Sequence, residues 1–149
     1  MILKALLGLA AVFGVFWTTK EKKLIPGIIT LGMIAGIILV LVPPATLLYP
    51  GIYIYMGFVA LAFIYGLTVK EKKIQDRITI CLMSASIFIY WLWALNHWHG
   101  NTLFFPIFTL LVLVAGVIGK VRLKAELGFI VILAVDAVAI IVEHWMKVT

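Results

Sequence analysis

One acidic residue, Asp136, stands in the middle of a long apolar segment, with Val135 and Ala137 on either side. A charge at the centre of a bilayer costs about 2.5–3.5 kcal/mol on insertion scales, and acids in such segments face a bundle interior or a water-filled cavity. Two roles suit this position: a relay for protons or cations, or a hydrogen bond that holds neighbouring helices or subunits together. We expect the second role, which we call a polar clasp.

Two further residues are assigned to the same polar site. Glu143 lies seven residues after Asp136, which is two helical turns along the same face and close to the end of the segment. Ser86 takes the position of Asp136 when the chain is written in rows of fifty residues, and a small side chain is expected where that position faces the centre of a bundle. The predicted clasp or proton relay therefore comprises Asp136, Glu143 and Ser86.

The three histidines offer a different chemistry. His97 and His99 follow the fourth apolar segment, and His144 ends the sixth beside Glu143. Three imidazoles and a carboxylate can supply an N3O ligand set for zinc or copper. Three tryptophans flank these histidines: Trp93, Trp98 and Trp145. Such neighbours are typical of an aromatic belt at the membrane surface, so we expect a belt, predict no cofactor, and keep the metal site as an alternative.

The composition indicates which elements must position these residues. Of 149 residues, 65% are hydrophobic and 12% are charged, against about 45–50% and 25% in an average soluble domain. Inside a bilayer every backbone polar group must be paired, which leaves helices or a closed barrel. The apolar runs lack the polar–apolar alternation of barrel strands. The sequence therefore predicts an all-α bundle in direct contact with lipid.

Six segments have the length of a membrane span, which takes about 20 apolar residues. They cover residues 2–19, 24–42, 51–69, 78–95, 102–119 and 127–146. Prolines at 43, 44 and 50 separate the second and third segments, and the polar stretch 96–101 separates the fourth and fifth. We expect six transmembrane helices arranged as three hairpins with short loops.

The charges predict the orientation of this bundle. Ten of the twelve Lys and Arg residues fall in three clusters about fifty residues apart: Lys20, Lys22 and Lys23; Lys70, Lys72, Lys73 and Arg77; Lys120, Arg122 and Lys124. Each cluster lies between two apolar segments, as cytoplasmic loops do under the positive-inside rule. We therefore expect a multi-pass protein of the plasma (inner) membrane with both termini extracytoplasmic, and no nucleic-acid partner.

The whole chain, residues 1–149, is expected to form one transmembrane domain. Residues 18–23 and 68–73 are identical at five of six positions. A triplicated hairpin over residues 1–50, 51–100 and 101–149 would explain this match, and so would the coincidence of regularly spaced hairpins. We favour coincidence and keep the repeat open.

Function is predicted more coarsely than architecture. The outer loops are too short for an extramembrane domain, and the sequence carries no nucleophile elbow, phosphate loop or metalloprotease helix. We expect a non-catalytic accessory or scaffolding subunit of a larger, ion-driven inner-membrane complex, with other membrane protein subunits as partners. The alternatives are a small proton- or cation-coupled transporter or channel that uses Asp136 and Glu143, and a membrane enzyme with a metal at its outer rim.

Overall fold

The computed structural model of the chain describes residues 2–21, 24–42, 45–70, 73–120 and 126–148. Every regular element in these ranges is a helix: α1 (Ile2–Glu21), α2 (Leu24–Leu41), the 3-10 turn η1 (Ala45–Leu47), α3 (Leu48–Thr68), α4 (Ile74–Leu95), α5 (Phe104–Ile118) and α6 (Leu127–Val148). The all-α prediction is confirmed, and each α-helix begins and ends within about four residues of a predicted segment. Several residues singled out in the sequence lie outside the described ranges: Lys22, Lys23, Pro43, Pro44, Lys72, Arg122 and Lys124.

The largest difference from the prediction is the first turn of α4. The helix begins at Ile74, four residues before the predicted segment, because its charged residues have partners. Arg77 donates from Nε to the carbonyl of Gly66 at 3.1 Å, and from its terminal nitrogen to the carbonyl of Leu67. These carbonyls belong to the last turn of α3, where no intrahelical donor remains for them. Arg77 thus joins the end of α3 to the start of α4.

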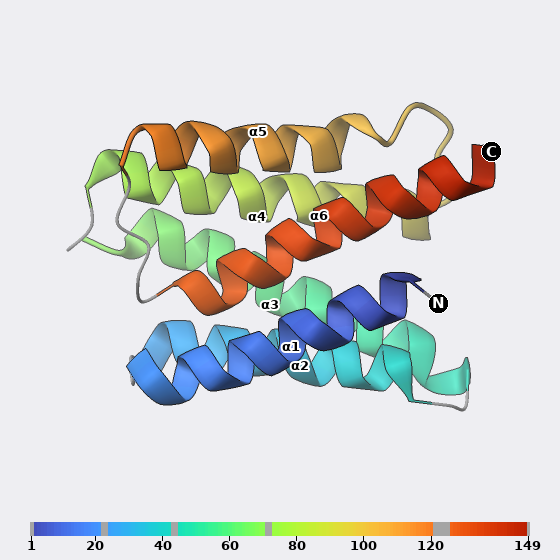
Figure 1. Ribbon diagram of the computed structural model, residues 1–149, viewed down its shortest axis with the longest axis horizontal. Helices are drawn as coiled ribbons and strands as arrows, with labels where there is room; N and C mark the ends of the chain where they lie inside the picture. The colour runs from blue at the N-terminus through green and yellow to red at the C-terminus, as the bar shows by residue number, and fades with distance from the viewer. Residues whose placement is uncertain (1, 22–23, 43–44, 71–72, 121–125, 149) are drawn as a thin grey trace.

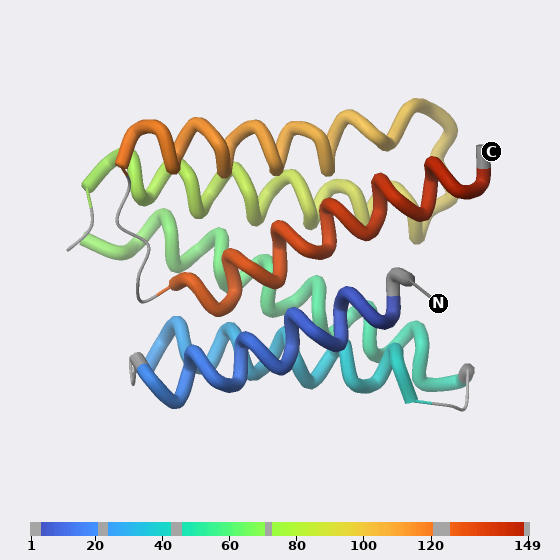
Figure 2. The backbone as a smooth tube through the Cα atoms, viewed as in Figure 1, coloured from blue at the N-terminus to red at the C-terminus, as the bar shows by residue number. Residues whose placement is uncertain are grey.

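Successive α-helices run in opposite directions along the long axis of the bundle (Figure 1). Each α-helix packs on its neighbour in the chain, and α6 returns to pack on α1, with further contacts to α2 and α4. The start of α1 and the end of α6 lie at one end of the bundle, on the right of Figure 2. We call this the terminal end. The opposite end, where α1, α3 and α5 finish, carries the described basic residues Lys20, Lys70 and Lys120, and we call it the basic end.

Two glycines, Gly36 and Gly51, let α2 and α3 approach each other closely. A Cβ atom on Gly36 would lie 2.7 Å from the backbone nitrogen of Tyr55 and 2.8 Å from the carbonyl oxygen of Gly51. Gly51 meets the backbone of α2 in the same way, at 2.8 Å from the carbonyl oxygen of Gly36. Small residues let helix backbones pack closely in membranes. This contact fixes the position of Tyr55 relative to α2.

The interior of the bundle is apolar, and so is much of its surface. Fully buried side chains of α2, α3, α4 and α6 form the core: Met33, Val59, Ala62, Ile80, Met83, Ile87, Phe129, Ile132, Leu133 and Ala137. Many large apolar side chains are also exposed on every α-helix. In a soluble protein such a surface would be an aggregation hazard, whereas in a bilayer it is solvated by lipid.

Four helices are long and apolar enough to cross a membrane: Leu24–Leu41, Leu48–Thr68, Ile74–Leu95 and Leu127–Lys147. The apolar helix α5 has 15 residues. At 1.5 Å per residue it extends about 22 Å, less than the roughly 30 Å hydrocarbon core of a typical bilayer. By the length and composition of its helices, the chain is a multi-pass membrane protein.

Candidate functional site

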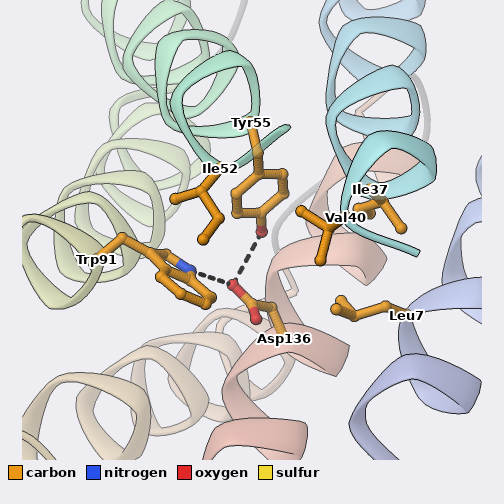
Figure 3. A pocket seen from close by; sticks show the side chains of 7 residues that line it. All are labelled: Leu7, Ile37, Val40, Ile52, Tyr55, Trp91 and Asp136. Carbon is orange, nitrogen blue, oxygen red and sulfur yellow. Dashed lines mark hydrogen bonds between the residues drawn. The ribbon is translucent and has the colours of Figure 1, made fainter. Parts of the chain in front are cut away.

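Asp136 lies inside the bundle and joins three helices. Its side chain is 1% exposed. The hydroxyl of Tyr55 on α3 donates to Asp136 Oδ2 at 3.0 Å, and the indole N–H of Trp91 on α4 donates to the same oxygen at 2.9 Å (Figure 3). The second oxygen, Oδ1, is buried and has no hydrogen-bond partner among the described residues. One carboxylate oxygen therefore binds two helices, while the other is left for a different partner.

A small cavity adjoins the carboxyl group. Five helices contribute its lining: Leu7 from α1, Ile37 and Val40 from α2, Ile52 and Tyr55 from α3, Trp91 from α4 and Asp136 from α6. Its volume of about 40 Å³ exceeds the roughly 10–15 Å³ that one water needs on the same measure. Apart from Asp136, Tyr55 and Trp91, the lining is aliphatic. The cavity has room for water, but the surface that faces it is apolar and offers a water no hydrogen-bond partner.

A second acid–tyrosine pair lies nearer the basic end. The hydroxyl of Tyr65 donates to Glu126 Oε1 at 2.6 Å, and Glu126 is fully buried just before α6 begins. The spacing matches that of the first pair: Tyr55 and Tyr65 are ten residues apart on α3, and Glu126 and Asp136 are ten residues apart in the sequence. Antiparallel helices keep such pairs in register. Tyrosine side chains thus reach from α3 to α6 at two levels about 15 Å apart.

Five buried hydroxyl groups are satisfied within their own helices. The hydroxyl groups of Thr30, Thr79, Ser84, Ser86 and Thr109 each donate to the backbone carbonyl four residues earlier, at 2.7–2.9 Å. These bonds contribute nothing between helices. The hydrogen bonds of Tyr55, Trp91 and Tyr65, by contrast, join side chains far apart in the sequence, through Asp136 or Glu126.

The other two residues of the predicted clasp lie elsewhere. Ser86 is buried on α4, but its hydroxyl donates to the carbonyl of Leu82 at 2.8 Å and it is not part of the cavity lining. Glu143 lies near the end of α6, pairs with Lys147 at 3.0 Å, and has a side chain that is 37% exposed. The polar stripe expected along α6 therefore consists of one interior acid and one acid at the surface.

The histidines lie at the terminal end. His97 and His99 are exposed in the segment between α4 and α5, and His144 is exposed on the last turns of α6. Within the described ranges no group of three or more His, Cys, Asp or Glu side chains is close enough to hold a metal ion. The structure therefore does not gather His97, His99, His144 and Glu143 into one ligand set.

Four residues of the site do not stand out in the sequence. The sequence does not distinguish Tyr55, Tyr65 and Trp91 from other aromatic residues, and Glu126 lies outside the predicted segments. A hydroxyl or indole donor can be assigned to an acid only when the facing helices are known. One signal was available, the shared ten-residue spacing of the two tyrosines and the two acids.

Comparison of the chain with protein-family models, with curated proteins and with solved structures gives no match. The helices and the buried acid define its class, a small multi-pass membrane protein.

Proposed function

We propose that the chain is a non-catalytic accessory or scaffolding subunit of a larger, ion-driven complex in the inner membrane. The observation that carries this proposal is that Asp136 is engaged in hydrogen bonds between helices. Its Oδ2 atom accepts hydrogen bonds from two other helices, which is a structural role that holds α3, α4 and α6 together. An acid engaged in this way builds a rigid body, as a scaffold requires.

The surface of α5 is the part we propose for contact with a partner subunit. This helix packs only on α4 and α6 among the described elements. Its outward side chains form an apolar stripe at helical spacing: Phe104, Ile107, Leu111, Val114 and Ile118. A helix shorter than the hydrocarbon core is accommodated by a thinner bilayer or by association with another helix. A partner helix on this stripe would relieve the mismatch.

Co-purification under mild conditions tests the proposal. Extracted from its native membrane, the chain should migrate with a larger partner at fixed stoichiometry. Leu111→Ala on α5 should reduce partner recovery by about fivefold, as expected for the loss of packing worth roughly 1 kcal/mol. Leu9→Ala is the matched control, because Leu9 is similarly exposed on α1 but far from the stripe. A chain that purifies alone from native membranes would contradict the subunit role.

We further propose that α1 and α5 also cross the membrane, giving six spans with the basic end in the cytoplasm and both termini outside. Lys20, Lys70 and Lys120 support this orientation because all three lie at the basic end. Two reporter enzymes are used, one active only outside the cytoplasm and one active only inside it. After Thr149, only the first should be active. After Lys120, only the reporter that works in the cytoplasm should be active. If the cytoplasmic reporter is active after Thr149, the proposed orientation is wrong.

A second candidate function is proton- or cation-coupled transport through Asp136 and Glu143. The observation in its favour is the Oδ1 atom of Asp136, which is buried, takes no part in the clasp and has no hydrogen-bond partner in the described part of the chain. Intramembrane acids in such positions are found on ion and proton pathways. Proteoliposomes that contain the chain alone would then show proton-dependent flux, and Asp136→Asn would abolish this flux without unfolding the bundle.

A further inference from the structure

A groove lies at the terminal end of the bundle, between five helices. Its lining comes from α1, α2, α3, α4 and α6, and its volume is about 340 Å³, which is within the range of small-molecule sites. The residues that α1, α3 and α6 contribute are three or four positions apart, so each of these helices presents one face to the groove. We call it the terminal groove.

The lining of the terminal groove changes from apolar to polar towards the end of the bundle. On α1, the buried side chain of Leu7 lies one turn deeper than the exposed side chain of Lys4. On α6, buried Ile140 lies one turn deeper than exposed His144, and exposed Lys147 follows at the outer end. A phospholipid has the same order, because its acyl chains lie below a polar headgroup.

The terminal groove also gathers the two basic residues that the charge pattern leaves unexplained. Ten of the twelve Lys and Arg residues belong to the three clusters between apolar segments, and the other two are Lys4 and Lys147. Both line this groove. Glu143 is the one acid among the described lining residues and pairs with Lys147 at 3.0 Å, whereas Lys4 is in no ion pair within the described ranges. Two lysines against one glutamate leave the lining with a net positive charge, to which His144 adds when it is protonated.

We propose that the terminal groove binds one anionic phospholipid. Its phosphate binds at Lys4 and Lys147, since a lysine ammonium holds phosphate as a point charge with three donors. The first part of an acyl chain packs on the buried side chains of Leu7 and Ile140. Basic pockets between transmembrane helices are known to bind anionic lipid headgroups. The inference goes beyond both the scaffolding and the transport roles and depends on neither.

The position of the groove favours a lipid over a soluble anion or an acidic peptide. The membrane-spanning helices α3, α4 and α6 each have one end here, at the level where phospholipid headgroups are the local anions. A soluble phosphate would contact the lysines and leave the apolar part of the lining without a partner. That apolar part reaches the outside of the bundle at Leu48, which lines the groove and is 37% exposed. An acyl chain can therefore continue from the groove into the bilayer.

Photo-cross-linking tests the site directly. The full chain is placed in phosphatidylcholine nanodiscs with a trace of phosphatidylglycerol that carries a diazirine at the start of one acyl chain, and the labelled peptides are identified by mass spectrometry. Label should fall on the groove faces of α1 and α6, and a small addition of unlabelled phosphatidylglycerol should displace it. The same diazirine on phosphatidylcholine should label these faces about fivefold less, the difference expected for one net charge at a membrane surface.

Three charge variants separate lipid binding from a general loss of structure. Lys4→Gln should reduce labelling by phosphatidylglycerol about fivefold. Lys20→Gln is the matched control, because it removes the same charge from the basic end of the same helix, and it should leave labelling of the groove unchanged. Glu143→Gln should increase labelling, because it frees Lys147 from its ion pair. An unfolded bundle could not produce these opposite changes.

A second measurement identifies the occupant in native membranes. A photoreactive amino acid in place of Leu48 should cross-link to an anionic phospholipid, and this product should be lost when Lys4→Gln is added. A fatty acid, a partner protein or a second copy of the chain cross-linked in its place would overturn the proposal. Equal labelling by the two lipid probes, or equal labelling of Lys4→Gln and Lys20→Gln, would do so as well.

Discussion

Replacing Asp136 with leucine is expected to destabilise the bundle by about 1–3 kcal/mol, whereas asparagine should leave its stability nearly unchanged. Leucine removes the acceptor for both Tyr55 and Trp91 and leaves two donors inside an apolar interior. Asparagine has nearly the same volume, and its amide oxygen can accept both bonds. The difference between the two variants therefore measures the clasp rather than the change in size.

The measurement is the free energy of unfolding in mixed micelles, followed by circular dichroism. Tyr55→Phe, which removes one of the two bonds, should fall between wild type and Asp136→Leu. Val138→Leu is a control for the added leucine, because Val138 lies on the exposed face of the same helix and should have little effect. An Asp136→Leu variant as stable as wild type would show that the clasp contributes nothing.

The same variants separate a clasp from a relay. Asparagine cannot carry a proton, so a relay would be lost in Asp136→Asn even though the complex stayed intact. A clasp gives the opposite order, with normal assembly and function in Asp136→Asn and weakened assembly in Asp136→Leu. Recording assembly and proton-dependent activity for both variants decides between these roles.

The second large effect is expected at Gly36. Changing it to alanine should destabilise the bundle by about 1–3 kcal/mol or more, the usual cost of overpacking a tight interior. Its new Cβ would meet the backbone of Tyr55 and Gly51 at under 3 Å, and a backbone cannot rotate away as a side chain can. The two helices would have to separate, which would also move the Tyr55 hydroxyl away from Asp136.

Gly57 offers a control within the same pair of helices. It is exposed on α3, and a Cβ there would have nothing within 4 Å. Gly57→Ala should therefore be neutral or slightly stabilising, because alanine is the better helix former by about 1 kcal/mol. Both variants are compared by the same unfolding measurement. Equal stability of Gly36→Ala and Gly57→Ala would mean that α2 and α3 do not pack as closely as described.

The sequence was informative wherever one property decides the outcome. Apolar length determines where a membrane helix lies, so the helices agree with the predicted segments. Depth alone marked Asp136 as unusual. The contacts of Asp136 depend on which faces of α3 and α4 point inward, and a charge pattern cannot show that. Arg77 shows the same dependence on packing. The charge pattern groups it with a loop, but it lies in the first turn of α4, where it bonds to the carbonyls of Gly66 and Leu67 at the end of α3.

The position of α6 in the chain has a consequence for biogenesis. It is synthesised after the other five helices, yet it is the helix that contacts α1, α2, α4 and α5 and supplies the acid for Tyr55 and Trp91. Until α6 enters the membrane, α1 lacks the helix that packs on it besides α2, and the side-chain donors of Tyr55 and Trp91 lack their carboxylate acceptor. A shortened chain that lacks α6 would therefore leave the hydroxyl of Tyr55 and the indole N–H of Trp91 without their acceptor.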